Sequence, residues 1–301
     1  MNRTNFKAYV AWIAVCISWS TTYLAIRIGV ESLPPMLFAG IRWIIAGSIF
    51  LVIQKGLGQK LPAKNEILPI AIVGIALLGI GNGLLVVAEQ WIPSGLAALL
   101  MATLPFWIVG FESLLPNGQH VNFKIILGLM LGLIGVLLIL GRDVSDWINS
   151  NYLIGILALM GAVISWSLGT IYSKYKKISV HPMMGASVQM LIAGSLQAML
   201  GLFLGEHNIF HLSESGLFAT GYLIIFGSII GYGSYMYAIS QLPLSLVSTY
   251  SYINPILALI LGWYILNEVL TINILFAAIL IIIGVMLVQK GNALIQVKQN
   301  V

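Results

Sequence analysis

The feature that most constrains this chain is a succession of ten apolar runs, each long enough to cross a lipid bilayer. A membrane-spanning helix needs about 20 mostly apolar residues. Only 8% of the residues are charged, against roughly 25% in a soluble domain, so the surface cannot face water. The sequence therefore predicts an all-α integral membrane protein. Its expected spans are residues 8–29, 34–54, 67–90, 93–115, 122–141, 152–173, 181–204, 216–239, 243–266 and 271–289.

Basic residues are unevenly distributed between alternate loops. If the N-terminus is cytoplasmic, the outer loops hold Arg27 and Arg142, and Arg42 lies inside a span. The other basic residues then fall on the inner side: Arg3, Lys7, Lys55, Lys60, Lys64, Lys124, Lys174, Lys176, Lys177, Lys290 and Lys298. Basic loops stay on the cytoplasmic side, so we expect both termini in the cytoplasm and the chain in the cell inner (plasma) membrane. The net charge of +5 is then a topology signal, and we expect no nucleic-acid partner.

The two halves of the chain repeat one another. Residues 17–20 and 164–167 both read ISWS, and residues 45–48 and 192–195 both read IAGS, in each case 147 residues apart. Further along the offset becomes 150, which pairs the two glycines and two prolines Gly81, Gly83, Pro93 and Pro105 with Gly231, Gly233, Pro243 and Pro255. Each half holds five predicted spans. Because five is odd, the second half would enter the bilayer from the opposite side.

This pattern predicts ten transmembrane helices as a 5+5 inverted repeat around a central cavity. The first repeat covers residues 1–147, the second covers residues 148–292, and residues 293–301 form a cytoplasmic tail. Inverted repeats are typical of secondary transporters, whose substrate site lies near the midplane between the repeats.

Several segments of the sequence carry a family resemblance. They are SWSTTYLAIRIG and PPMLFAGIRWIIAG, then PSGLAALL with Pro105, and finally NPILALILGWYILNE at residues 254–268. With these pieces in this order, the chain resembles the drug/metabolite transporter superfamily in its bacterial EamA-type branch, over about residues 8–290. The resemblance implies a 5+5 inverted repeat, cytoplasmic termini and export of small metabolites or amino acids. One departure is that Asn267-Glu268 is matched by Asn117-Gly118 in the first half, so no symmetric acid pair is implied.

Marked residues on four helices reach similar depths. At 1.5 Å per residue, Trp19 lies about 16 Å into its helix, Trp166 about 20 Å, Asn254 and Pro255 about 17 Å and Pro105 about 18 Å. All are near the middle of a hydrocarbon core about 30 Å thick. The shared depth predicts one central cavity. Each proline also frees a carbonyl, which either accepts from a substrate amine or only marks a structural kink.

Further cavity candidates are aromatic, amide and hydroxyl side chains inside the spans. They are Tyr23, Asn82, Thr170, Tyr232, Tyr235, Ser248, Tyr250 and Asn254. Such a lining suits a neutral or zwitterionic ligand with an apolar part, whereas a phosphate would need a cluster of Arg or Lys. Helix 243–266 is expected to supply much of the hydrogen bonding. The alternative is that its Ser and Thr side chains hold helices together.

Three charged residues are candidates for ion coupling. Arg42 is the only basic residue well inside a span, where charge is costly and often functional, although a structural pairing with backbone carbonyls or Glu89 is the alternative. Glu112 is expected to reach cytoplasmic water. No nucleotide-binding G-x-x-x-x-G-K-[ST] motif occurs, so export is expected to be uncoupled or loosely coupled to protons through Glu89, Glu112 or Glu268.

Catalysis is not expected. The four histidines fall in loops or at helix ends, and no metal-ligand spacing occurs, so we expect no catalytic residue, metal or cofactor. The sequence predicts a secondary transporter that exports small metabolites such as amino acids or amphiphilic drugs. A membrane channel or a lipid flippase is the alternative. The expected partners are a small-molecule substrate, the lipid bilayer and, if export is coupled, protons. The chain is expected to be a monomer or a homodimer.

Overall fold

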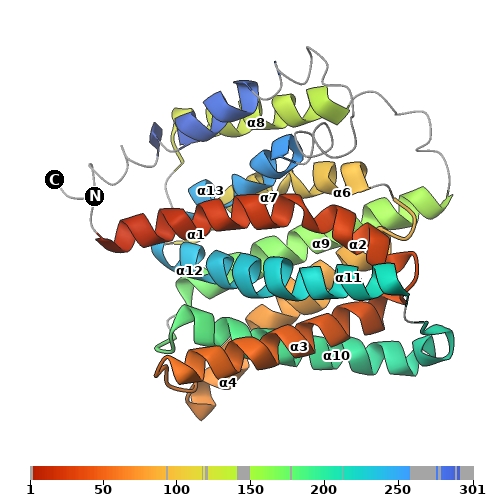
Figure 1. Ribbon diagram of the computed structural model, residues 1–301. Coiled ribbons are helices and arrows are strands. Elements are labelled where there is room, and N and C mark those ends of the chain that lie inside the picture. Colours follow the sequence, from red (N-terminus) through yellow and green to blue (C-terminus); the bar gives the residue numbers. More distant parts are fainter. Residues whose placement is uncertain are drawn as a thin grey trace.

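The computed structural model is a bundle of helices (Figure 1). It describes residues 3–92, 94–116, 118, 121–140, 150–176, 178–211, 213–257, 276, 279–288 and 290–291. Within these ranges every regular element is helical. The predicted repeat boundary between residues 147 and 148, the predicted tail at 293–301, and Asn117, Asn267 and Glu268 lie outside the described residues.

Six helical segments of the described chain are long and apolar enough to cross a membrane: Phe6–Val30, Pro35–Gly56, Lys64–Ala88, Leu153–Tyr175, Pro182–Phe203 and Glu214–Gln241. Two shorter apolar helices are Phe123–Gly135 and Ile279–Val288. Each of these segments overlaps one predicted span. The chain is therefore an all-helical, multi-pass membrane protein, as its apolar runs predict.

Four helices run without interruption: α3 (Pro35–Gly56), α8 (Phe123–Leu140), α9 (Ser150–Tyr175) and α10 (Pro182–Phe203). The first predicted span is instead divided at Thr21 into α1 (Arg3–Ser20) and α2 (Thr22–Val30). The Thr21 side chain donates to the carbonyl of Ser18 at 2.8 Å. A hydroxyl that bonds back to its own helix in this way often bends the helix.

The two prolines predicted to kink their helices do not interrupt them at the expected place. The span with Pro105 is broken at residues 102–103 into α6 (Ser94–Met101) and α7 (Leu104–Ser113), so Pro105 lies in the first turn of α7. A proline costs little there, because that N–H has no partner within the helix. The other span is broken earlier, between α13 (Leu244–Val247) and the helical residues 250–257 that contain Pro255.

Two further spans contain a π-helix in the middle. The first consists of α4 (Lys64–Gly74), η1 (Ile75–Asn82) and α5 (Gly83–Ala88). The second consists of α11 (Glu214–Tyr222), η3 (Leu223–Tyr232) and α12 (Gly233–Gln241). Both π-helices end 150 residues apart, at Asn82 and Tyr232. Wide turns of this kind are rare and are often found at functional sites, so their equivalent positions single out these two helices.

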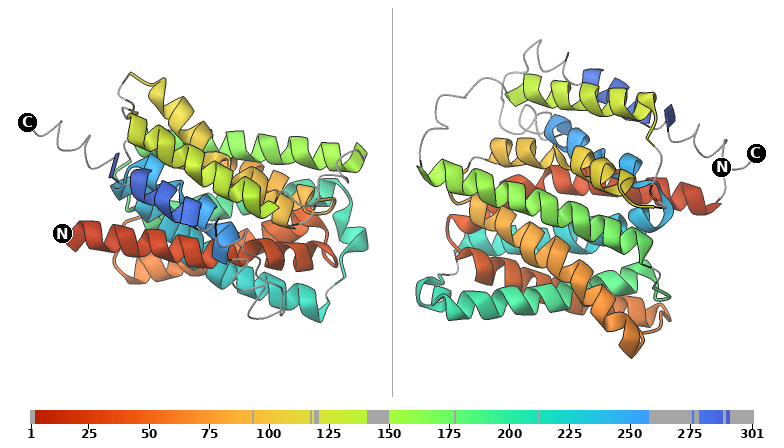
Figure 2. Two further views of the ribbon diagram at one scale, coloured as in Figure 1. Left: turned by 90° about the horizontal axis from the view of Figure 1, so that it is seen from above. Right: turned by 180° about the vertical axis from the view of Figure 1, so that it is seen from behind.

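The helices pack in equivalent pairs across the molecule. Helix α1 lies along η3 and α12, whereas α9 lies along η1 and α5, and the views in Figures 1 and 2 agree with these neighbours. The most extensive contact joins α3 to α10. Gly40 of α3 approaches Ala198, and Gly194 of α10 approaches Ile44. Small residues of this kind let helix backbones approach closely in lipid.

The N-terminus of α3 is capped from outside the helix. Glu206 begins the 3-10 helix η2 (Glu206–Ile209) and is 8% exposed. Its carboxylate accepts from the backbone N–H of Leu37 at 2.7 Å and of Met36 at 3.2 Å. These N–H groups would otherwise have no acceptor, because the first turn of a helix leaves its donors unpaired.

We expect Glu206→Ala to lower the free energy of unfolding by about 1–2 kcal/mol, the usual cost of losing an N-cap. The measurement is thermal unfolding of the purified protein in detergent, with Glu214→Ala as the matched control. Glu214 begins α11 and has an exposed side chain. If the two variants lowered the unfolding temperature equally, the capping hydrogen bonds of Glu206 would not stabilise the fold.

Candidate functional site

A cavity lies between the two halves of the bundle. Its wall consists of Trp19, Thr22, Tyr23, Ile26, Arg42, Trp43, Asn82, Leu85, Met101, Trp166, Gly227 and Tyr250. Its free volume is about 50 Å³, enough for a few water molecules. A metabolite therefore enters only after the surrounding side chains separate.

Trp19 is the centre of the aromatic wall. Its ring centroid lies 5.4 Å from that of Trp166, 5.2 Å from that of Tyr235 and 4.9 Å from that of Tyr250. The indole N–H donates to the carbonyl of Gly227 at 2.9 Å. Residue 227 lies inside a π-helix, whose wider turn presents carbonyls that the regular α-helical ladder would use. The Trp19 indole is thus fixed by a hydrogen bond inside an apolar bundle.

A second chain of polar contacts lies behind Trp166. Its indole N–H donates to the Tyr235 hydroxyl at 3.1 Å, and that hydroxyl shares a 2.6 Å hydrogen bond with Thr170. Thr170 and Tyr235 are almost fully buried, at 1% and 0% exposed. They do not line the cavity, so they orient Trp166 from behind the wall.

Arg42 is held by two partners. Its Nη2 donates to the Asn82 side-chain oxygen at 2.7 Å, and its guanidinium carbon lies 4.2 Å from the centroid of the Trp43 ring. Asn82 accepts a second hydrogen bond, from the Trp43 indole at 3.0 Å. Asn82 is the last residue of η1, so the end of the π-helix positions the cation at the cavity.

The same contact exists in the second half with neutral groups. The Tyr232 hydroxyl donates to the Gln189 side-chain oxygen at 2.8 Å. Tyr232 follows Asn82 by 150 residues, and Gln189 follows Arg42 by 147. The tryptophans are paired likewise: Trp19 packs on Gly231, and its counterpart Trp166 packs on Gly81.

Three hydroxyl groups of the 243–266 span, those of Ser248, Thr249 and Ser251, are used within the span itself, whereas the Tyr252 hydroxyl donates to the carbonyl of Leu129 in α8 at 3.2 Å. Ser248 donates to the carbonyl of Ser245 at 3.3 Å, Thr249 to that of Leu246 at 2.6 Å and Ser251 to that of Ser248 at 2.9 Å. None of these three hydrogen bonds reaches the cavity or another helix. Of the described residues of this span, 243–257, only Tyr250 lines the cavity.

Asn254 lies next to the wall rather than in it. It is 1% exposed, and in its favoured orientation the amide nitrogen donates to the carbonyls of Cys16 and Tyr250, at 3.1 and 3.0 Å. It also forms a hydrogen bond with Tyr23, which lines the cavity. Asn254 therefore joins its helix to the first span, directly behind the wall.

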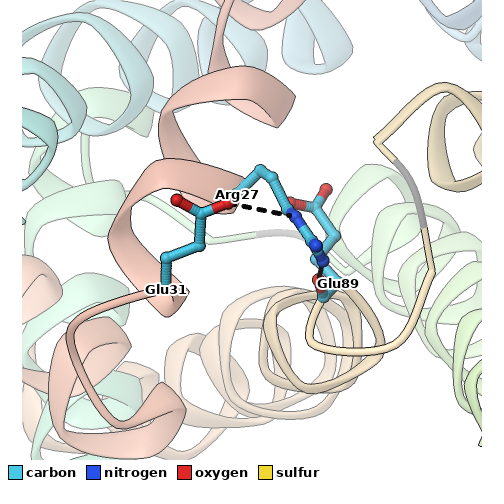
Figure 3. Close-up of polar contacts among 3 residues, drawn as sticks. All are labelled: Arg27, Glu31 and Glu89. Carbon is cyan, nitrogen blue, oxygen red and sulfur yellow. Dashed lines mark hydrogen bonds and ion pairs between the residues drawn. The ribbon is translucent and has the colours of Figure 1, made fainter.

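Glu89 is fully buried at one end of the cavity-lining helices, at 0% exposed. Arg27 donates from Nη1 to the backbone carbonyl of Glu89, and its Nε lies 3.7 Å from a carboxylate oxygen of Glu31 (Figure 3). Neither carboxylate oxygen of Glu89 has a hydrogen-bond partner among the described residues. Glu89 is therefore an acid enclosed by protein, although it directly follows the last residue of α5.

Glu112 is also buried, at 3% exposed, so the prediction that it reaches cytoplasmic water is wrong. One carboxylate oxygen accepts from the Tyr175 hydroxyl at 2.8 Å, and the other has no partner among the described residues. Lys174 interacts with this carboxylate electrostatically. The reason for the burial is that α7 packs against α9, which covers the end of the span.

Five of the twelve predicted cavity residues lie in its wall: Trp19, Tyr23, Asn82, Trp166 and Tyr250. The others are buried behind or beyond it: Pro105, Thr170, Tyr232, Tyr235, Ser248, Asn254 and Pro255. Of the predicted charged residues, Arg42 lines the cavity, whereas Glu89 and Glu112 do not.

Sequence reasoning missed Thr22, Ile26, Trp43, Leu85, Met101 and Gly227. Helical spacing from a predicted residue indicated three of them. Thr22 and Ile26 follow Trp19 by three and seven residues, which places them on the same helix face. Leu85 likewise follows Asn82 by three.

Among the described residues, no three His, Cys, Asp or Glu side chains form a group that could hold a metal ion. Apolar spanning helices around a partly aromatic cavity define a multi-pass membrane protein. The chain belongs to the EamA-like transporter family, whose model matches residues 6–141 and residues 153–289. It is thus a membrane transporter, and the family indicates transport rather than catalysis.

Relatives cover nearly the whole chain. The "Uncharacterized inner membrane transporter YedA" of Escherichia coli strain K12 is 37% identical over 98% of this chain and 95% of its own. The "Uncharacterized transporter YoaV" of Bacillus subtilis strain 168 is 30% identical over 93% of this chain and 95% of its own. A "Probable amino-acid metabolite efflux pump" of Escherichia coli strain K12 is 23% identical over 92% of this chain and 93% of its own.

The fold also has a relative among solved structures. One crystal structure superposes with a TM-score of 0.78 at 21% sequence identity, over 93% of this chain and 95% of the other. At that identity the likeness concerns the fold alone.

Proposed function

We propose that this transporter is a secondary exporter of small metabolites, such as amino acids or amphiphilic drugs, that works by alternating access. In this proposal residues 1–147 and 148–292 are two five-helix repeats of opposite orientation in the inner membrane, with both termini cytoplasmic. The observation that carries it is the pairing of contacts at constant offsets. Arg42–Asn82 and Gln189–Tyr232 are one such pair, and the ends of the two π-helices are another.

Paired contacts have a mechanical consequence. Two similar halves that face opposite sides can exchange conformations, so that a site open to one side becomes open to the other. The small free volume of the cavity fits a state in which the site is largely closed. A carrier passes through such a state in every transport cycle, and a lipid flippase would need a cavity open toward the bilayer.

The lining indicates the kind of ligand. Trp19, Trp43, Trp166 and Tyr250 offer apolar and aromatic surface, and Asn82 and Arg42 offer polar groups at one end. Such a combination suits a small amphipathic molecule. One relative named as a probable amino-acid metabolite efflux pump is consistent with this ligand class.

We expect Trp19→Ala to reduce flux of a transported compound about fivefold or more, because one aromatic contact with a ligand contributes about 1 kcal/mol. Asn254→Ala should reduce flux less, since its amide acts through Tyr23 and the backbone. The test is a screen of labelled amino acids and amphiphilic drugs in liposomes that contain the purified protein. Trp91→Ala, at an exposed tryptophan, is the matched control.

Two outcomes would contradict the proposal. If neither Trp19→Ala nor Asn254→Ala changed any flux, the site would be misplaced. If flux did not saturate and external substrate did not accelerate counterflow, the protein would be a channel and not a carrier.

A further inference from the structure

Two buried ionisable side chains, one in the wall of the cavity and one behind it, interact electrostatically without forming an ion pair. Arg42 lines the cavity and is 2% exposed. Glu89 follows Leu85 of the wall by four residues, on the same helix face. The carboxylate of Glu89 interacts electrostatically with Arg42, but no Arg42 nitrogen lies within the 4.0 Å that defines an ion pair.

Both groups keep atoms without a partner. The Arg42 Nε and the two carboxylate oxygens of Glu89 are buried and make no hydrogen bond within the described residues. A buried charge without a hydrogen-bonded partner is strongly unfavourable. Arg27 also interacts electrostatically with the Glu89 carboxylate, but its hydrogen bond is to the backbone carbonyl of Glu89 and its ion pair is with Glu31, so both carboxylate oxygens keep no hydrogen-bond donor among the described residues. Among the described residues, Tyr23 is a further titratable group that interacts electrostatically with the carboxylate.

The second half of the chain offers an internal comparison. The residue 147 positions after Arg42 is Gln189, and the residue 150 positions after Glu89 is Ile239. Gln189 still accepts a hydrogen bond from the end of the second π-helix. The packing of these helices therefore does not require a charge at either position, and both positions are charged only in the first half of the chain.

We propose that Arg42 and Glu89 form a charge-reading subsite that selects ligands with both a carboxylate and an ammonium group. The ligand carboxylate accepts from the Arg42 Nε–H, and the ligand ammonium donates to Glu89. The apolar part of the ligand lies against Trp19, Trp43 and Trp166. This inference rests on the transport function proposed above, and it separates zwitterions from amphiphilic cations, which would leave Arg42 unpaired.

The test uses three molecules of the same shape and different charge. Leucine is a zwitterion at neutral pH, leucinamide is a cation and isocaproate is an anion. Binding of each to the full-length protein in lipid nanodiscs is measured by isothermal titration calorimetry. We expect the wild type to bind leucine about tenfold more tightly than either analogue, the effect of about one charged hydrogen bond.

Each variant is expected to move the preference in its own direction. Arg42→Gln, which copies the second half, should favour leucinamide over leucine, whereas Glu89→Gln should favour isocaproate. Arg27→Gln is the control, since it removes a cation near Glu89 that does not line the cavity, and it should keep the preference for leucine. Thermal unfolding of each variant checks that the fold is retained.

The subsite is overturned if the wild type binds leucinamide as tightly as leucine, or binds none of the three. It is also overturned if both glutamine variants weaken all three ligands equally, because a structural role would do that. The transport proposal fails separately. If the liposomes carry amphiphilic drugs in a Trp19-dependent way but leucine is not bound, transport stands and the charge-reading subsite falls.

Discussion

Gly194→Val is expected to leave no folded, monodisperse protein after purification in detergent. A Cβ on residue 194 would lie 2.8 Å from the backbone nitrogen of Ile44 and 2.9 Å from the carbonyl oxygen of Gly40. Cβ atoms do not approach backbone this closely, so α3 and α10 would have to separate. These two helices form the most extensive helix–helix contact of the described chain. Because the clash involves the Cβ itself, no rotamer of valine relieves it.

Graded substitutions make this prediction quantitative. Gly194→Ala should lower the free energy of unfolding by about 1–3 kcal/mol, the usual cost of overpacking. Gly221→Ala is the control, since nothing lies within 4 Å of a Cβ at that position. There the gain in helix propensity of up to about 1 kcal/mol should stabilise the helix. Both are measured by thermal unfolding followed by size-exclusion chromatography. Equal unfolding temperatures for the two alanine variants would refute the close contact.

The sequence predicted the helices well because the property that defines them is local. A run of about 20 apolar residues can be read without knowing its neighbours, and each of the six long spans in the described chain was located to within a few residues. Interruptions were predicted less well. The break before Tyr250 and the π-helices contain no proline, so nothing local distinguishes them, and Pro105 begins a helix where a kink was expected.

The candidate site was predicted only where a side chain is distinctive by itself. Trp19 and Asn82 stand out because a large polar ring or an amide is rare in the middle of an apolar helix. Met101 could not stand out, since its side chain resembles every other apolar residue that faces lipid. The burial of Glu112 was missed because depth along a helix measures distance from the span's end, whereas burial depends on which helix covers that end.

Lys174 ties two helices together at the opposite end of the bundle from Arg27. Its ammonium donates to the carbonyls of Ile239 and Leu242, at 2.8 and 2.9 Å. Arg27 makes the equivalent bond to the carbonyl of Glu89. The two basic residues are 147 positions apart, and the carbonyls of Glu89 and Ile239 are 150 apart. The end of α12 is therefore held to α9 in the way that the end of α5 is held to α2.

If alternating access opens one end while the other stays closed, breaking the Lys174 tie should shift the protein toward the state open at that end. Hydrogen bonds to a charged group contribute about 1.5–3 kcal/mol each, and about 1.4 kcal/mol already changes the ratio of two states tenfold. We therefore expect Lys174→Met to lower export at least tenfold. A buried residue near the Lys174 hydrogen bonds should become accessible to solvent about tenfold more often.

Thr170 is suited to be that residue, because it lies one turn before Lys174 and is 1% exposed. The cysteine of the described chain is Cys16, which is buried, and Cys16→Ser removes it as a competing thiol. In a Cys16→Ser, Thr170→Cys background, Lys174→Met should raise the rate of labelling by a water-soluble thiol reagent about tenfold or more. Lys176→Met removes the same charge from an exposed position and should change neither the labelling nor the export. If Lys174→Met and Lys176→Met labelled at the same rate as their common background, the Lys174 tie would not control access, and Lys174 would only cap the end of α12.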